Sequence, residues 1–416
     1  MRQLLIFTFL AFFVSVSTSA YNRNFFPLGE RESYMGNAGT AFESSTGNGF
    51  FNPAGLAYIE NNQLSVTGSV YQLYGATHNN VAFKDSKTID YKNDGFNAIP
   101  ATVVSVVKKK RFAYSILVLV PNALQLQNVT EIETTNTKGV YSQQVNNQEL
   151  WAGLAFGYQL TKRWSLGITG WALKSSSLTS TSYVARHKTE ANTVSNLNTW
   201  QQTDVIGASI TTGVMYRVND VLNIGFRFQT PMFQVLGSAI NSEKRQDVVA
   251  GVIDTTTEVD IFEQGTEANT RVPADMTLGF SINFTDELKL LSDISFQTGS
   301  SFQSMPNSTL NEQISYKPTL RYNFGMSYEL LYQLHVLGGV YYNPDNLETL
   351  AGRLTGQKVD FTGGTLGIVL IENYAEIGAG AYFSRGTGQS IIGPDKRTSD
   401  VTILAYGFLL STSFQL

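Results

Sequence analysis

The sequence predicts an all-β fold, namely a transmembrane antiparallel β-barrel of about 14 strands with an N-terminal hatch inside its lumen. Three observations predict it. Apolar and polar residues alternate at period two along many segments, and the connections between them are in turn very short and long. The composition is rich in glycine, phenylalanine and tyrosine but has only 15% charged residues. Cysteine is absent, which excludes disulfides and thiolate metal sites.

Residues 1–20 are expected to be a secretory signal peptide. Arg2 precedes an apolar run from Leu4 to Val16, and small residues ending in Ala20 follow it. The run is too short to cross a bilayer as a helix, which takes about 20 residues. We therefore expect export and removal of this segment, with the mature chain starting near Tyr21.

The alternation is clearest from Leu150 to Leu160, where the even positions are apolar and the odd ones include glycine and glutamine. Similar patterns lie in 222–228, 276–284 and 320–330. Charged residues of the strands fall opposite the apolar face: Arg217, Arg227, Lys289, Asp293, Arg321 and Glu329. A lipid-facing Arg or Lys at mid-depth costs about 2–4 kcal/mol, so this segregation indicates a lipid-facing exterior. The alternative is a water-soluble β-sandwich, which also alternates but turns its apolar face inward.

Connection lengths favour the barrel. Very short turns occur at 109–110, 161–163, 219–221 and 285–287, whereas the polar stretches 122–147, 178–199 and 237–266 are long. Short periplasmic turns and long outer loops are the barrel arrangement. The net charge of −4 shows no basic excess, so nucleic acid is not expected as a partner.

The remaining segment precedes the first predicted strand and does not alternate. We expect residues 21–61 to form a hatch, or plug, and residues 62–416 to form the barrel. A barrel of this size encloses a space that must be filled or conduct water. Insertion of the segment would bury its phenylalanines, which are Phe25, Phe26, Phe42, Phe50 and Phe51.

Two stretches of the hatch carry a resemblance to a known family. These stretches, 34–41 (YMGNAGTA) and 49–57 (GFFNPAGLA), resemble the opening of FadL-like outer-membrane transporters for long-chain fatty acids and aromatic hydrocarbons. The similarity continues through Thr230-Pro231, through 272–280 and into the turn at 285–288. The glycine-rich setting of Asn52-Pro53-Ala54 is the most specific of these features.

The resemblance implies that Gly36, Gly39, Asn52, Pro53 and Ala54 are hatch residues. It also implies a hydrophobic pocket above the hatch and exit sideways through the wall at a kinked strand. Pro fixes φ and Asn tolerates turn geometry, so Asn52-Pro53 can set a tight bend. The place to look for the kink is Pro121-Asn122, at the end of the third predicted strand.

Function is expected to be passive uptake of hydrophobic small molecules across the outer membrane of a Gram-negative bacterium. Large apolar residues at inward strand positions are the candidate ligand pathway: Trp151, Trp171, Met215, Leu291 and Leu337. The expected partners are a fatty acid or aromatic hydrocarbon, outer-membrane lipids and the barrel assembly machinery.

No catalytic residue, metal site or cofactor is predicted. His78, His187 and His335 show no metal-ligand spacing, and there is no GxSxG nucleophile elbow. His78 and His187 are expected in outer loops. An outer-membrane lipase stays formally open, because it needs only a serine, a histidine and a polar orienting residue. The main alternative is an adhesin, phage receptor or structural barrel without transport.

Overall fold

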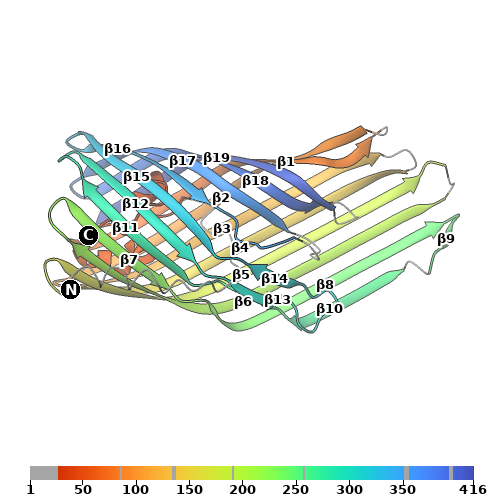
Figure 1. The fold of residues 1–416 in the computed structure, drawn as a ribbon, viewed down its shortest axis with the longest axis horizontal. Helices are drawn as coiled ribbons and strands as arrows, with labels where there is room; N and C mark the ends of the chain where they lie inside the picture. The colour runs from red at the N-terminus through yellow and green to blue at the C-terminus, as the bar shows by residue number, and fades with distance from the viewer. Residues whose placement is uncertain are drawn as a thin grey trace, which may run out of the picture.

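The computed structural model describes residues 27–416 except 85–86, 134–136, 190–191, 256–257, 351–355 and 393–396. The expected signal peptide and residues 21–26 of the expected hatch lie outside the described residues. Three short helices precede the strands: η1 (Glu32–Tyr34), α2 (Asn48–Phe51) and η2 (Pro53–Tyr58). The strands run along one elongated barrel (Figure 1): β1 (Gln63–Lys84), β2 (Lys87–Lys109), β3 (Phe112–Glu133), β4 (Thr137–Gln159), β5 (Trp164–His187), β6 (Val194–Arg217), β7 (Leu222–Gln229), β8 (Phe233–Val249), β9 (Val252–Ile253), β10 (Val259–Glu267), β11 (Asp275–Asn283), β12 (Leu288–Gln297), β13 (Ser300–Gln303), β14 (Gln313–Tyr316), β15 (Thr319–Leu331), β16 (Leu334–Asn343), β17 (Gln357–Glu372), β18 (Ala375–Ile392) and β19 (Arg397–Gln415).

The barrel is closed by its first and last strands. β1 pairs antiparallel with β19 from Gln63–Gln415 to His78–Val401. Within the described residues, the closed antiparallel wall has fourteen strands, which confirms the predicted fold class. β7 with β8 forms one of these wall strands, and β10 with β11 forms the next. β13 and β14 form a separate hairpin outside the wall.

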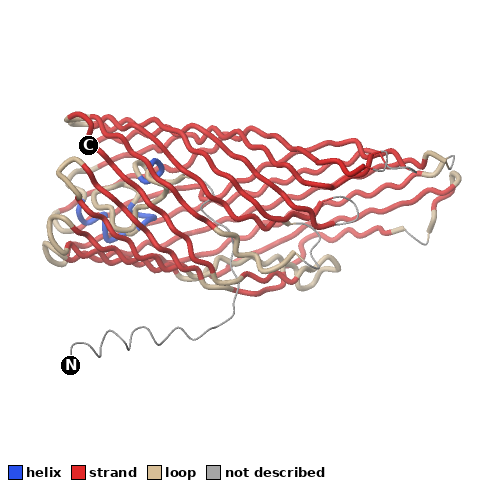
Figure 2. The backbone as a smooth tube through the Cα atoms, turned by 45° about the horizontal axis from the view of Figure 1, so that its top comes forward, coloured by secondary structure: helices blue, strands red, loops and turns tan. Residues whose placement is uncertain are grey.

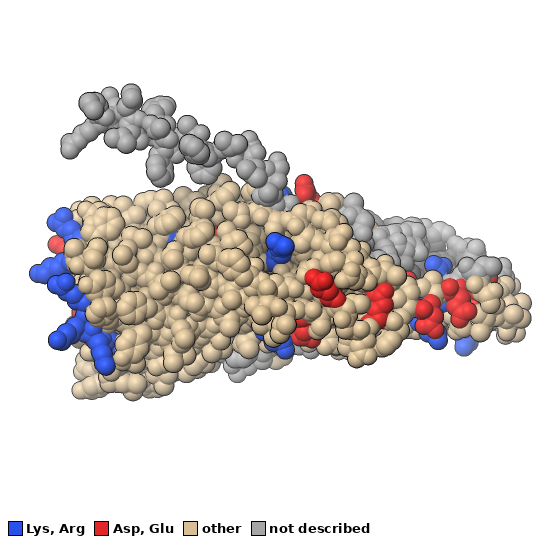
Figure 3. Space-filling view, turned by 90° about the horizontal axis from the view of Figure 1, so that it is seen from below, with Lys and Arg blue, Asp and Glu red and all other residues tan. Residues whose placement is uncertain are grey.

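The wall has an apolar outer face and charged residues on its inner face, as the alternation predicts. Leu154 and Phe226 are exposed on the outside, whereas Arg227, Asp293 and Arg321 are buried inside. On the face shown in Figure 3, Lys and Arg gather at the end with the short turns, and acidic side chains lie in the opposite half. The band between them shows few charges, as a lipid-facing belt requires. Among the described residues, no helix has both the length and the apolar character needed to cross a membrane.

The prediction of long outer loops at three stretches is wrong for most of their residues. Most of 122–147, 178–199 and 237–266 belongs to strands, because β3 to β6, β8 and β10 extend past the belt. A strand crosses a bilayer in about 9–11 residues, whereas β5 has 24. Beyond the membrane water wets both faces, so apolar residues no longer alternate there.

Two neighbouring wall strands are interrupted at prolines. Thr230-Pro231-Met232 separates β7 from β8, and residues 268–274, which contain Pro273, separate β10 from β11. Proline has no N–H to donate to a ladder. The backbone N–H of Met232 donates to the carbonyl of Val272 across the two interruptions (2.8 Å). These are two of the sites that carry the family resemblance.

The described part of the N-terminal segment, residues 27–62, lies inside the end of the barrel that has the short turns. Figure 2 shows its helices enclosed by the wall strands. It contacts opposite sides of the wall, with hydrogen bonds to β5 (Thr169), β6 (Val214), β12 (Asp293), β15 (Asn323), β17 (Thr365) and β19 (Ser411). Most of its side chains are buried.

Candidate functional site

Asn52 fixes the bend of the N-terminal segment and ties it to the wall. Its side-chain oxygen accepts from the backbone N–H of Ala54 (3.2 Å) and caps η2, with Pro53 in the first helical position. Its amide group donates to the carbonyls of Thr40 (2.7 Å) and Val214 (3.1 Å). One side chain therefore links two parts of the segment to β6.

Inward-facing glycines let the segment lie directly against the strands. A Cβ at Gly167, Gly213 or Gly339 would overlap Pro53, Asn52 or Met35, respectively. Within the segment, Gly36 has a φ of 62° and lies against Val340, so it needs both the left-handed conformation and the missing side chain. Gly39 packs against Glu32 and Phe51.

Further polar groups anchor the segment around the lumen. Asp293 accepts from the backbone N–H groups of Gly39 (2.9 Å) and Thr40 (3.0 Å) and from the Thr40 hydroxyl (2.8 Å). Arg31 forms an ion pair with Glu376 of β18 (2.5 Å), and Glu43 forms one with Arg217 of β6 (2.6 Å). These bonds join the segment to three separated wall strands.

Two of the predicted pathway residues form an aromatic floor with Phe50. The Phe50 ring meets the rings of Trp151 and Trp171 edge-on, both at 6.1 Å between centroids. The two indoles also contact each other at 5.5 Å. The Trp171 indole N–H donates to the Thr211 hydroxyl (3.0 Å).

The other three predicted pathway residues lie among buried side chains inside the barrel. Met215 packs with Ala54 and Tyr58 of the N-terminal segment. Leu291 and Leu337 belong to the main buried cluster, together with Tyr34 and Met35. The alternation thus correctly placed all five side chains inward, but none of them lines the large cavity.

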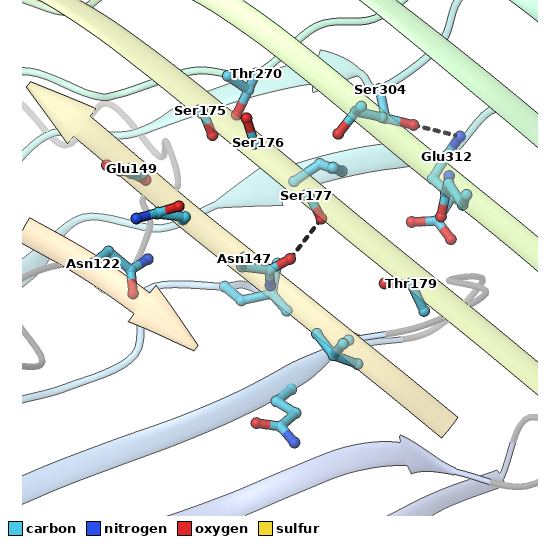
Figure 4. A pocket seen from close by; sticks show the side chains of 18 of the residues that line it. Asn122, Asn147, Glu149, Ser175, Ser176, Ser177, Thr179, Thr270, Ser304 and Glu312 are labelled. Carbon is cyan, nitrogen blue, oxygen red and sulfur yellow. Dashed lines mark hydrogen bonds between the residues drawn. The ribbon is translucent and has the colours of Figure 1, made fainter. Parts of the chain in front are cut away.

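A cavity of about 330 Å³ lies on the outer side of the aromatic floor. Glu149 lines it on β4, two residues from Trp151, and accepts from the Trp151 indole N–H (3.2 Å). Figure 4 shows the polar side of the cavity, where Asn147, Ser177 and Glu312 are labelled. The Ser177 hydroxyl donates to the Asn147 side-chain oxygen (2.6 Å), which fixes both side chains.

The cavity has one polar wall and one mainly apolar wall. The polar wall comes from β4, β5 and β6: Gln143, Asn147, Gln148, Glu149, Ser175, Ser176, Ser177, Thr179, Gln201 and Thr203. The apolar wall comes from β1, β17, β18 and β19 and from two connections: Tyr74, Ile314, Tyr316, Leu347, Val359, Phe361, Ile391 and Ile403. A ligand would thus meet hydrogen-bonding groups on one side and hydrocarbon on the other.

Two connections cover the cavity, and we call them the cap: residues 298–318, which contain β13 and β14, and residues 344–350. They pair with each other through the Tyr316–Leu347 bridge and through Lys317 N–H to the Asn346 carbonyl (2.7 Å). Their apolar cluster consists of Phe302, Ile314, Tyr316, Leu347 and Leu350, with Ile391 of β18. Asp345 holds the second connection in place, accepting from the backbone N–H groups of Leu347 and Val359. Burial raises the pKa of Asp345 to about 6.

The wall is irregular where β3 passes the cavity. The register of β3 against β4 shifts between Leu119 and Asn122, so Val120 and Pro121 together oppose Leu150. This is a β-bulge at the predicted kink. The pairing of β2 with β3 also ends there, at Thr102–Leu119, and Asn122 lines the cavity. Among the described residues, β3 beyond this point pairs with β4, and the facing part of β2 pairs with β1.

A second cavity, of about 30 Å³, adjoins the N-terminal segment and suits one water molecule. Arg227 and Arg321 line it, and both guanidinium groups are bonded to Asp275. The two arginines therefore share one buried carboxylate. This cluster joins β7, β11 and β15 behind Phe50. The Phe50 ring lies 5.3 Å from the Arg227 guanidinium carbon.

Sequence reasoning missed the cavity residues because the strand segments that form the polar wall do not alternate. Five lining residues also fall in stretches predicted to be long loops: Asn122, Gln143, Val145, Asn147 and Thr179. His78 was likewise expected in an outer loop, but it is buried on β1 with its ring nitrogen 2.7 Å from the Ser390 hydroxyl. His187 is the last residue of β5 and His335 lies on β16. No group of three or more potential metal ligands occurs among the described residues. The repeated Ser and Thr of 175–181, which suit strands, were the available signal.

The family model for outer membrane protein transport proteins (OMPP1/FadL/TodX) matches residues 30–350, which include the N-terminal segment, the bulge and the interrupted strands. The chain belongs to this family. Proteins of this family are transport proteins of the outer membrane rather than enzymes. A search of curated proteins returned no match.

Solved structures of FadL/TodX-family proteins share the fold. A Pseudomonas aeruginosa FadL homologue superposes with a TM-score of 0.68 at 15% identity, covering 96% of this chain and 100% of its own. The P. putida toluene transporter TodX gives 0.68 at 14%, covering 93% and 98%. The Ralstonia pickettii toluene transporter TbuX gives 0.60 at 15%, covering 94% and 99%. At these identities the likeness establishes the barrel fold.

Proposed function

We propose that the protein is a channel for passive uptake of hydrophobic small molecules across the outer membrane of a Gram-negative bacterium. The observation that carries the proposal is the cavity between the cap and the aromatic floor. Asn122 lines this cavity, close to the point where the pairing of β2 with β3 ends. Apolar area that leaves water gains about 25 cal/mol per Å², which suffices to draw a hydrocarbon into such a site. Two proteins with similar structures, TodX and TbuX, are toluene transporters. The resemblance of the N-terminal segment to FadL-like transporters adds long-chain fatty acids as candidates.

In this proposal the N-terminal segment, residues 21–61, acts as the hatch. It blocks the lumen below the cavity, so a ligand that enters under the cap leaves between β2 and β3 at Pro121-Asn122 into the membrane. Met215, Leu291 and Leu337 pack among hatch residues, and they meet a ligand only when the hatch moves. Trp151 and Trp171 lie beneath the cavity with Phe50, so they too meet a ligand only when the hatch moves. Outer-membrane lipids and the barrel assembly machinery are the other proposed partners.

Deletion of Pro121 tests the route. It removes the extra residue, restores a continuous register with β4 and should close the gap beside the cavity. Pro121→Ala is the matched control, because it keeps the extra residue. Uptake of labelled toluene and of a labelled fatty acid would be measured in cells that depend on this protein. We expect uptake to fall several-fold in the deletion variant alone, while heat-modifiable migration on gels stays normal.

The second candidate function is a receptor or adhesin. The observation that favours it is the outer half of β4, β5 and β6, a polar sheet of Ser, Thr, Asn and Gln that extends past the belt. The uptake assay separates the two functions. If the wild-type protein takes up neither compound, the transport function is rejected in favour of the receptor.

A further inference from the structure

We infer that the cavity selects uncharged hydrophobic compounds that carry hydroxyl groups and disfavours carboxylate anions such as fatty acids. The inference rests on the proposed function and specifies the ligand class of the same site. It follows from the charges of the lining, from the polar groups that face the cavity and from the position of the apolar wall.

The charged groups of the lining are all acidic. Glu149, Glu312 and Asp345 line the cavity from three different elements, and each is buried. No Lys, Arg or His lies among the lining residues that the structure describes. Charges in a partly desolvated site interact more strongly than in water. A fatty acid carboxylate would therefore enter a negative field without a cation to receive it.

Two of the three carboxylates, Asp345 and Glu149, are held in place by hydrogen bonds from the protein. Both oxygens of Asp345 accept backbone N–H groups, at 2.7 Å from Leu347 and 3.0 Å from Val359. Glu149 accepts from the indole of Trp151. A carboxylate oxygen has further lone pairs, so these groups can also accept a ligand hydroxyl. These carboxylates already accept hydrogen bonds from the protein, so they do not depend on a ligand cation. An ammonium group would lose its hydration on entering the cavity, which opposes its attraction to the carboxylates.

The polar groups facing the cavity suit a hydroxyl. Serine, threonine and amide side chains of β4 to β6 line the polar wall, among them Ser175, Thr179 and Gln148, and they offer both donors and acceptors. A ligand hydroxyl can donate to some of these groups and accept from others.

The apolar wall receives the rest of the ligand. Phe361, Ile403 and Leu347 are buried there beside Tyr74. A molecule with hydroxyl groups at one side and hydrocarbon at the other therefore matches both walls at once. An alkane would leave the polar wall without partners, and a fatty acid would add a fourth negative charge.

Binding of matched probes tests the inference. The probes are radiolabelled decan-1-ol, decanoate, decane and decylammonium at pH 8, dialysed against the full chain in nanodiscs and corrected with empty nanodiscs. We expect decan-1-ol to bind at least about tenfold more tightly than decanoate, a difference of about 1.4 kcal/mol. The double variant Glu149→Gln with Glu312→Gln should reduce that ratio several-fold by strengthening decanoate binding. Asp286→Asn with Glu287→Gln, in a short turn remote from the cavity, is the control and should leave the ratio unchanged.

The outcomes separate this inference from the proposed function. Decanoate or decylammonium binding as tightly as decan-1-ol overturns the inference and leaves a hydrophobic channel standing. An unchanged ratio in the glutamate variant also overturns it, because the carboxylates then do not select. If none of the four probes binds, the proposed function itself fails.

Discussion

Single glycines decide how closely the N-terminal segment can lie against the wall. Gly167 and Gly170 lie three residues apart on β5, but a Cβ at Gly167 would overlap Pro53, whereas one at Gly170 would meet nothing within 4 Å. Gly167→Ala should therefore displace the segment, at a cost of about 1–3 kcal/mol, which is typical of overpacking. The measurement is proteolysis of the segment in the folded barrel, together with leak of a small hydrophilic dye.

Gly170→Ala is the matched control for this residue. It adds the same methyl group to the same strand on the opposite face. Equal protease sensitivity in the two variants would contradict the close contact between β5 and Pro53.

Glu30 is a buried carboxyl of the N-terminal segment, and it makes the packing of this segment inside the barrel depend on pH. Burial, followed by the charge of Glu376, raises the pKa of Glu30 from 4.5 to about 7, against the opposing influence of Arg31 and of hydroxyls from Thr46 and Ser413. The seated segment thus holds a proton between these two pH values, where an exposed Glu30 would be ionised. The stability of the seated state falls as pH rises across this range, and the penalty is complete above about pH 7.

Dye leak through liposomes that contain the protein should therefore increase as the pH rises from about 4.5 to about 7 and should level off above that pH. Glu30→Gln should remove this step, because glutamine does not titrate. A step of the same size in the variant would assign the pH dependence to another group.

At the scale of elements, the bend at Asn52-Pro53 joins α2, η2 and β6. Asn52→Ala with Pro53→Gly removes three hydrogen bonds, one of which caps η2, but leaves the wall ladder intact. The barrel should assemble normally, while dye leak or ligand uptake changes because the segment no longer holds one shape. Heat-modifiable migration and the two transport assays measure this.

Asn61→Ala is the control for the bend. It removes one exposed hydrogen bond, to Gln415, at the end of the segment and away from the bend. Loss of barrel assembly in the double variant would show that the bend is needed for folding, contrary to this prediction.

The alternation of residues predicted the elements well wherever lipid bathes one face. It placed Arg227, Asp293 and Trp151 inside and Leu154 outside, because a bilayer penalises the wrong assignment strongly. It failed beyond the belt, where both faces of β4 to β6 meet water and polar residues such as Ser175 and Ser177 are tolerated anywhere. Since the cavity lies at that boundary, its polar wall could not be predicted.

Two further features that the sequence did not predict, the cap and the packing of the aromatic floor, depend on contacts between distant parts of the chain. The cap depends on the pairing of Tyr316 with Leu347, across two connections whose sequences show no alternation. Trp151 and Trp171 were recognised as inward and apolar, but their packing on Phe50 depends on how the segment seats. Their role as ligand contacts stays a prediction.

For the whole molecule, the uncharged belt sets its position in the membrane. Leu154 is 68% exposed within the belt, so Leu154→Arg should impair assembly at a cost of about 2–4 kcal/mol. Val249 is also exposed but ends β8, far along the polar extension, and Val249→Arg should assemble normally. The measurement is the amount of heat-modifiable protein in the membrane fraction. Equal loss in both variants would contradict this placement of the belt.

The extended strands place the outer opening of the barrel well above the membrane. β5 has 24 residues, of which a bilayer takes about 9–11, and the remainder at about 3.3 Å per residue and a tilt of about 45° rises about 30 Å above the lipid. The surface of a Gram-negative cell is covered by the sugar chains of its outer leaflet, in which greasy solutes dissolve poorly. In the proposed channel, a solute that enters under the cap would start its passage within or above that carbohydrate layer. The height of the barrel would then let such a molecule bypass the layer that slows it most.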